Sequence, residues 1–528
     1  MTGTGLLVRL AVRAERVIVA SWTLLIVALC AGTVSYVHRF FPTPEALRAY
    51  ADVIDANPVF LGLGGPVSQP SVGAMAAWRA GGLPYLLAGW MAVSLVIRRT
   101  RAEEDTGRME LLLAGALGRY APVTAALLTA CGACLLVGAA SAAFLIAAAG
   151  LGAPGSLAYG AAIAVAGCVF AAVAALTAQL AQNARTARAL ALTALGLSYV
   201  LRYVGDASGH SWLVWLSPLG WSHLVRPYGD SAPWPLAFSA LATALVLAAA
   251  YRLVARRDLG EGLLPVRQGP AEGPSLRGPF ALAWRLQRGL LARWLVGVVA
   301  AATLFAGLSG VAPRLAEQPG NVLSAFIQRY GGPSGDPVDA YLWIILLFLG
   351  YTTALYPVLA MLRLHAEETT GLAEALLATA TSRLRWATGH LAFALGGTVL
   401  LMGAGGLVTG LIAGSLLDAP VLPRVMAGAL GQVAAAWVVG AVAAVAVCAL
   451  PRISVAVSWA AWALVFVVGD LCGPLIGLWG WGRMQPFHYV PNTVAGARFA
   501  AAPLLTLLAL TALLVALALA RLRTRDLN

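Results

Sequence analysis

The sequence predicts an all-α polytopic membrane protein. Hydrophobic residues make up 60% of the 528 residues and charged residues only 11%, whereas soluble proteins carry about 25% charged residues. No charged residue lies between Arg119 and Arg185. A membrane-spanning helix needs roughly 20 mainly apolar residues, so this stretch alone is long enough for two spans.

Six spans are predicted in the first half of the chain, residues 1–259. Arginines cluster before the first span and again after the second, fourth and sixth spans. Because basic residues mark cytoplasmic loops, this pattern places the N terminus inside the cell. Thr43 and Pro44 have the character of an N-cap and a first helical residue, which predicts a short helix outside the membrane. The predicted spans are 17–37, 72–97, 121–150, 156–182, 189–205 and 233–254.

A linker rich in glycine and proline is predicted at 260–280. The same order of predicted spans and loops then repeats in residues 281–528. Arg285, Arg288 and Arg293 flank the seventh span, and the eighth span ends at Arg363. About 12 spans in total give each half an even number. The halves are therefore expected to be parallel repeats with both chain termini in the cytoplasm.

An acidic motif supports this duplication. The pattern Ala-Glu-Glu-x-Thr-Gly-x-x-Glu occurs at 102–110 and again at 366–374, 264 residues later. Because alanine and leucine matches are common in such a chain, the matched polar residues and glycines carry the argument. Further matches join Arg119 to Arg383, Val204-Gly205-Asp206 to Val468-Gly469-Asp470, and Arg257-Asp258-Leu259 to Arg525-Asp526-Leu527.

The motif predicts a short amphipathic helix on the cytoplasmic surface. Glu103, Gly107 and Glu110 would share one face of that helix. Glu104 and Arg108 would pair at helical spacing. Acidic residues contribute little to membrane topology, so their repetition favours a docking site for a partner over a solvated loop.

The two copies differ at one informative position. Leu372 stands where the first copy has Arg108. We therefore expect Glu104 to be partly neutralised within its own helix and Glu368 to stay free to bind a partner.

A second candidate site lies at the outer ends of the fifth span and its counterpart. Asp206 and Asp470 occupy matching positions there, and Arg202, one turn before Asp206, could pair with it. The second half has Phe466 in place of that arginine. An ionisable residue at membrane depth can mark a gate or pathway, and an interfacial aspartate can cap a helix. The second interpretation is favoured, and both stay open.

Charge and cysteine usage exclude several other functions. The net charge of +13 follows from arginines between spans, so no nucleic-acid partner is expected. All 35 basic residues are arginine, and without lysine the chain cannot form a Walker A loop. ATP hydrolysis by this chain is therefore not expected. Cys131 and Cys134 lie within a span without histidine or acidic neighbours, which predicts packing residues rather than a metal site.

The chain resembles permeases of the ABC-2 type, most of all double-length actinobacterial exporter permeases of tetronasin-type antibiotic efflux. The resemblance rests on residues 101–114, their second copy, and the stretch Leu216-Ser217-Pro218-Leu219-Gly220-Trp221. It covers essentially the whole chain. In such permeases the segment after the second span is a coupling helix that docks on the ATPase.

The resemblance implies a plasma-membrane permease subunit that is not itself an enzyme. Two copies of a separate ATPase would bind ATP and Mg²⁺, and a hydrophobic or amphiphilic small molecule would be exported. No cofactor or metal is expected in this chain. The candidate coupling residues, including arginines of the same segments, are Glu103, Glu104, Gly107, Arg108, Glu110, Arg119, Glu367, Glu368, Gly371, Glu374 and Arg383.

Two alternatives stay open. An ion-coupled secondary transporter would need charged residues near the membrane midplane, whereas most charges here lie at span ends. An integral-membrane lipid-linked transferase would need carboxylates, histidines or metal ligands gathered at one membrane face. The duplicated glutamates fit paired docking better than a single active site.

Overall fold

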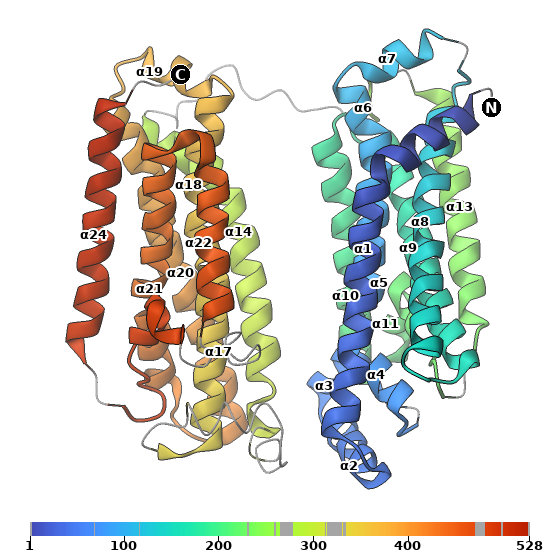
Figure 1. The fold of residues 1–528 in the computed structure, drawn as a ribbon, viewed down its shortest axis with the longest axis horizontal. Coiled ribbons are helices and arrows are strands. Elements are labelled where there is room, and N and C mark those ends of the chain that lie inside the picture. The colour runs from blue at the N-terminus through green and yellow to red at the C-terminus, as the bar shows by residue number, and fades with distance from the viewer. Residues whose placement is uncertain are drawn as a thin grey trace. The chain divides into compact units, whose positions relative to one another are not determined.

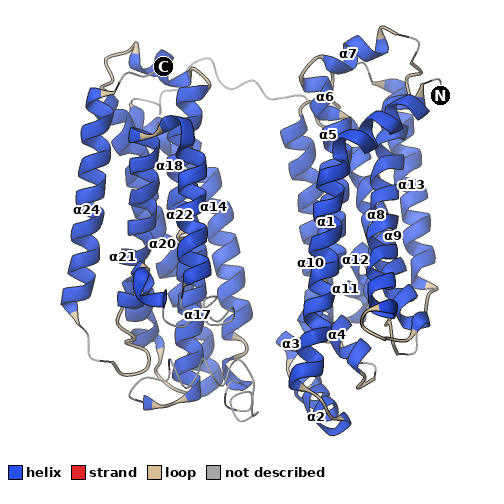
Figure 2. Ribbon diagram, in the orientation of Figure 1, coloured by secondary structure: helices blue, strands red, loops and turns tan. Residues whose placement is uncertain are grey.

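The computed structural model consists of helices and loops, with no strand in the part of the chain that it describes (Figure 2). The predicted all-α membrane class is confirmed. The chain divides into two compact units, unit 1 (Met1–Gly269) and unit 2 (Pro270–Asn528), with the division inside the predicted linker. The described residues are 3–67, 69–115, 117–229, 232–257, 260–263, 278–311, 313, 330, 334–469, 481–497 and 500–525.

Unit 1 is a bundle of long helices with short helices at both ends. The motif and the chain's N terminus lie at one end, and α2, α3 and α4 lie at the other (Figure 1). We call the first end the motif end. The helices are α1 (Thr4–Phe40), α2 (Pro44–Asp55), α3 (Pro58–Gly64), α4 (Val72–Ala80), α5 (Leu83–Arg99), α6 (Arg101–Asp105), α7 (Arg108–Leu113), α8 (Ala121–Ala147), α9 (Ala153–Leu180), α10 (Ala184–Ser208), α11 (Ser211–Trp215), α12 (Pro218–His223) and α13 (Pro235–Arg256).

Small residues let the central helices of unit 1 approach closely. A Cβ atom on Gly138 of α8 would lie only 2.3 Å from the carbonyl oxygen of Gly160 on α9. Close helix packing through small residues is typical of membrane bundles. At the opposite end, the Thr43 hydroxyl accepts from the amide of Ala46 at 3.2 Å, which confirms the predicted N-cap of α2.

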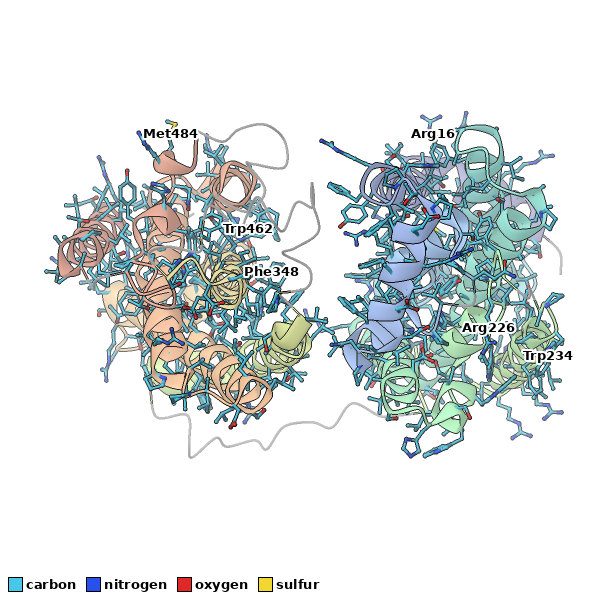
Figure 3. All side chains as sticks on the ribbon, turned by 90° about the horizontal axis from the view of Figure 1, so that it is seen from below. Arg16, Arg226, Trp234, Phe348, Trp462 and Met484 are labelled. Atoms are coloured by element: carbon cyan, nitrogen blue, oxygen red, sulfur yellow. The ribbon has the colours of Figure 1, made fainter. Side chains whose placement is uncertain are left out.

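Unit 2 repeats this plan, with α19 and the chain's C terminus at one end of its bundle, again called the motif end (Figure 1). Side chains occupy the space between its helices (Figure 3). The Trp462 ring stacks on Phe466 with centroids 5.3 Å apart. The helices used below are α14 (Pro279–Ala306), α17 (Pro337–Thr353), α18 (Leu355–Thr369), α19 (Leu372–Leu377), α20 (Arg383–Leu417), α21 (Leu422–Ala449), α22 (Ser454–Val468) and α24 (Ala501–Thr524).

Nine helices among the described residues are long and apolar enough to cross a membrane. The predicted second span is a bent pair, α4 and α5, with an angle of 49° at the break. The predicted fifth span corresponds in position to α10, which is not among these nine helices, and α22 is a shorter apolar helix at the matching place in unit 2. The total of about 12 spans stays a prediction, as does the orientation of the termini. Residues 264–277 of the predicted linker lie outside the described residues.

Candidate functional site

The acidic motif forms two short helices in unit 1, and the predicted single amphipathic helix is wrong. Helix α6 ends at Asp105 and α7 begins at Arg108. Between them Gly107 adopts a left-handed conformation with φ of 72°, and its amide donates to the Glu104 carbonyl oxygen. A glycine in this conformation ends a helix because other residues rarely adopt it. Glu103 and Glu110 therefore do not share one continuous helical face.

Unit 2 makes the same turn at the same motif position. Gly371 has φ of 75°, and α19 begins directly after it at Leu372. Here α18 continues from the span into the motif and ends at Thr369. In both units a short helix is thus set off from the end of the second span. We call residues 101–113 and 366–377 the motif segments.

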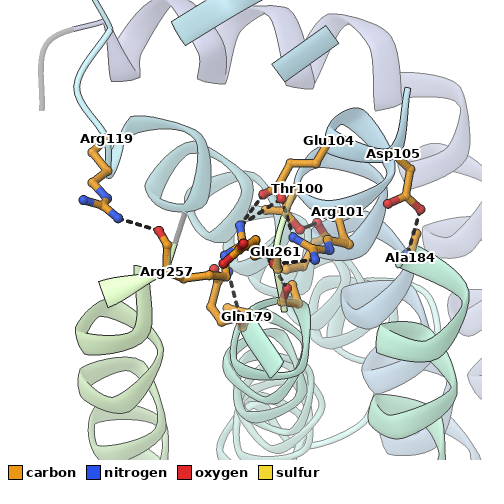
Figure 4. Close-up of polar contacts among 12 residues, drawn as sticks. Thr100, Arg101, Glu104, Asp105, Arg119, Gln179, Ala184, Arg257 and Glu261 are labelled. Carbon is orange, nitrogen blue, oxygen red and sulfur yellow. Dashed lines mark hydrogen bonds and ion pairs between the residues drawn. The ribbon is translucent and has the colours of Figure 1, made fainter. Parts of the chain in front are cut away.

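The second glutamate of each motif binds an arginine just beyond the last helix of its own unit. Arg257 donates from Nη2 to both carboxylate oxygens of Glu104, at 2.7 and 2.8 Å. Arg101 also donates to this carboxylate, as Figure 4 shows. In unit 2, Arg525 Nη2 lies 2.5 Å from Glu368 Oε1. The predicted pairing of Glu104 with Arg108 and the expected free state of Glu368 are both wrong.

The matched arginines Arg119 and Arg383 complete the same arrangement. Arg119 donates to the carbonyl oxygen of Arg257 (Figure 4), and Arg383 donates to that of Arg525 at 2.6 Å. Each of these side chains therefore holds the backbone just after the last helix of its own unit. We call the two clusters the glutamate–arginine latches: Glu104, Arg257 and Arg119 in unit 1, and Glu368, Arg525 and Arg383 in unit 2.

The first glutamates of the two motifs have different surroundings. In unit 1, the Glu103 side chain is 21% exposed, and Arg99 and Arg108 each lie 3.7 Å from it. It borders a cavity of about 80 Å³ that Pro122 and Ala126 also line.

In unit 2, Glu367, which matches Glu103 in the sequence repeat, is buried. Its carboxylate accepts hydrogen bonds from Trp386 at 3.0 Å and from His390 at 3.2 Å. These two residues match Pro122 and Ala126 of unit 1, which lie 264 residues earlier. The side-chain amide nitrogen of Gln287 lies 3.2 Å from the other ring nitrogen of His390, Nδ1, within hydrogen-bonding distance. Since an amide nitrogen only donates, the histidine carries its proton on Nε2, facing Glu367.

Several other motif residues are exposed at the motif end, whereas Met109 and Ala373 are buried. Glu110 and Leu111 are exposed in unit 1, as are Leu372 and Glu374 in unit 2. Leu111 and Leu372 expose 79% and 59% of their surfaces. Arg108 is also mostly exposed. Each unit thus presents a short helix with an exposed leucine and an exposed glutamate, next to its glutamate–arginine latch.

At the other end of unit 1, the predicted pairing of Arg202 with Asp206 is confirmed. Their closest atoms are 3.1 Å apart, and the Arg202 side chain is fully buried. Arg202 also donates to the carbonyl oxygens of Gly62 and Leu63 on α3. The pair therefore fastens α10 to α3. Its proposed counterpart Asp470 lies outside the described residues.

Comparison with known proteins decides the family. A family model for the C-terminal domain of the multidrug efflux system permease Rv1217c matches two stretches, residues 6–253 and 276–523. The chain belongs to this permease family. The multidrug efflux system permease protein Rv1217c of Mycobacterium tuberculosis is 39% identical to it over 535 residues, covering 99% of this chain and 95% of that protein. This Rv1217c-type permease is accordingly a multi-pass protein of the plasma membrane.

Sequence reasoning missed four side chains of this permease's motif ends. Arg257 and Arg525 carried a signal, because their triplets match between the halves. That match served only as a mark of the repeat, since nothing in the spacing places them beside the motif. Trp386 and His390 carried no such signal, because the first half has Pro122 and Ala126 at these positions.

Proposed function

We propose that this chain is the membrane-spanning subunit of an ATP-driven exporter of the ABC-2 type. Two copies of a separate ATPase would dock on its two motif segments. Closure of the ATPase dimer around nucleotide would then move the motif segments and open a path for cargo. The observation that carries the proposal is the presence, in both units, of one exposed short helix set off by a left-handed glycine after the second span.

The chemistry of these short helices suits a protein partner. Each short helix carries an exposed leucine and an exposed glutamate, which can supply an apolar contact and a polar contact at an interface. The glutamates Glu110 and Glu374 stand in the first turns of α7 and α19. We assign the docking contact to these exposed residues and to Gly107 and Gly371. The latch residues do not contact the partner in this proposal; they hold the motif segments in position. They include Glu104, Glu368, Arg119 and Arg383.

ATP and Mg²⁺ belong to the partner in this proposal. With no lysine in its sequence, the chain lacks the residue that reaches the phosphates in a Walker A loop. Two motif segments in one chain call for two ATPase copies. The printed name of the Mycobacterium tuberculosis relative describes multidrug efflux, and we propose hydrophobic or amphiphilic small molecules as cargo here too.

We propose a structural role for the outer pair, Arg202 and Asp206. Arg202 is a buried arginine that binds a carboxylate and two backbone carbonyls, and removing one partner of a buried pair is costly. Such a pair stabilises the contact between α10 and α3. Asp206 lies within α10, and the N-cap of the next helix, α11, is His210. This proposal therefore replaces the helix-cap interpretation and does not need Asp206 in a gate.

The purified chain is expected to show no ATPase activity alone and to form a complex with two ATPase copies. The physical reason is one docking segment in each unit and the missing lysine. Mass measurement of the intact complex would test this ratio, with the isolated ATPase as a control for its own dimerisation. A stable complex with a single ATPase copy that hydrolyses ATP and drives transport would contradict the proposal.

A further inference from the structure

The two glutamate–arginine latches have the same construction, and their residues match between the two halves of the sequence. In each unit a motif glutamate binds the arginine that directly follows the last helix. That helix is α13, which ends at Arg256, in unit 1, and α24, which ends at Thr524, in unit 2. The guanidinium of each arginine also donates to a carbonyl oxygen near the C-terminal end of another long helix, α9 in unit 1 and α21 in unit 2. These contacts are Arg257 with Ala178 at 3.5 Å and Arg525 with Val447 at 3.2 Å.

The latch glutamates are poorly placed to contact a partner. Their side chains are only 10% and 9% exposed, and the arginine side chains that hold them are 8% and 16% exposed. Partly buried, charge-assisted hydrogen bonds are stronger than exposed ion pairs. A partner that bound Glu104 or Glu368 directly would first have to displace Arg257 or Arg525. The exposed residues after Gly107 and Gly371 can be reached without this cost.

The latch joins elements that are far apart in the sequence. Glu104 precedes Arg257 by 153 residues, and Glu368 precedes Arg525 by 157. The backbone carbonyls of both arginines are in turn held by Arg119 and Arg383. Since both the side chain and the backbone of each arginine are fixed, the end of the last helix is expected to follow the motif segment when that segment moves.

We propose that Glu104 with Arg257, and Glu368 with Arg525, are positioning contacts that pass movement of each motif segment to the last span of the same unit. The inference rests on the proposed function, because the movement comes from a docked ATPase. It adds the route by which docking reaches α13 and α24. The glutamates are positioning residues, and the exposed residues of α7 and α19 form the docking contact.

Unit 2 offers the cleaner test. His365 stands there at the position of Arg101, so an arginine at position 368 would not face the counterpart of that guanidinium. The variants are Glu368→Gln, Arg525→Gln, and the charge swap Glu368→Arg with Arg525→Glu. Glu374→Gln serves as the matched control, because Glu374 belongs to the same motif but is exposed on α19. All variants are prepared as the full complex with the ATPase.

The measurement is hydrogen–deuterium exchange of backbone amides, with and without trapping by MgATP and vanadate. In the parent complex, trapping is expected to change exchange both in residues 366–377 and at the end of α24. In the two Gln variants the change in 366–377 is expected to persist, and the change at α24 to be lost. The charge swap is expected to restore it, which a loss of folding would not do. Glu374→Gln is expected to weaken ATPase binding while α24 still responds in the complexes that form.

The proposal is overturned if α24 responds in Glu368→Gln and Arg525→Gln as it does in the parent, or if α24 does not respond in the parent while 366–377 does. Failure of the proposed function looks different. In that case residues 366–377 of the parent complex would not respond to trapping at all.

Discussion

A Gly107→Val variant is expected to bind its ATPase about tenfold more weakly while inserting into the membrane normally. Gly107 has φ of 72°, and a Cβ atom there would meet no atom within 4 Å. The substitution therefore acts through the backbone alone. A left-handed residue other than glycine costs about 1–2 kcal/mol, and this strain lowers the population of the docking-competent turn by about that factor of ten. Titration of the ATPase onto the reconstituted chain measures the affinity.

Asparagine provides the control for this prediction, because it adopts the left-handed conformation far more readily than a β-branched residue. Gly107→Asn is expected to bind nearly as well as the parent, and Gly371 should show the same order of effects. Equal losses in the Val and Asn variants would mean that the side chain blocks the partner, and equal binding of both would mean that the turn is not required.

A Glu367→Ala variant is expected to lose about 1–3 kcal/mol of stability, because the buried N–H donors of Trp386 and His390 would be left without an acceptor. Glu103→Ala is expected to cost less than about 1 kcal/mol, since its side chain is part-exposed and its arginine partners lie 3.7 Å away, too far for a hydrogen bond. Thermal unfolding of the two purified variants, measured side by side, checks the difference.

A second experiment transfers the two donors of Glu367 to the matching positions around Glu103. Pro122→Trp with Ala126→His would place the side chains of unit 2 around Glu103 and fill the cavity there. Glu103→Ala should cost more stability in this background than in the parent. Equal thermal shifts for Glu103→Ala and Glu367→Ala in the parent, or no added cost in the graft, would contradict this account.

Hydrophobic content and arginine spacing were sufficient to predict the fold class. They depend on the membrane as a solvent, which acts on each segment separately. The pairing of Arg202 with Asp206 was predictable for a similar reason, since it lies within one helix at i, i+4.

The internal geometry of the motif was not predictable in the same way. The predicted pairing of Glu104 with Arg108 assumed one continuous helix through the motif. Gly107 instead separates α6 from α7. Arg108 therefore lies 3.7 Å from Glu103 and does not pair with Glu104. The true partner, Arg257, lies 153 residues away from Glu104, and contacts at such separation depend on helix packing. The expected inequality of the two motifs exists, but at Glu103 and Glu367 rather than one residue later.

The central claim is that the exposed helices after Gly107 and Gly371 contact an ATPase, and site-specific photo-crosslinking tests it most directly. A benzophenone amino acid replaces Leu111 or Leu372, and a third variant carries it at Trp212, which is similarly exposed beyond α10 in unit 1. We expect covalent adducts with the ATPase from positions 111 and 372 and none from position 212. No adduct from either leucine position in a complex that still hydrolyses ATP would contradict the account.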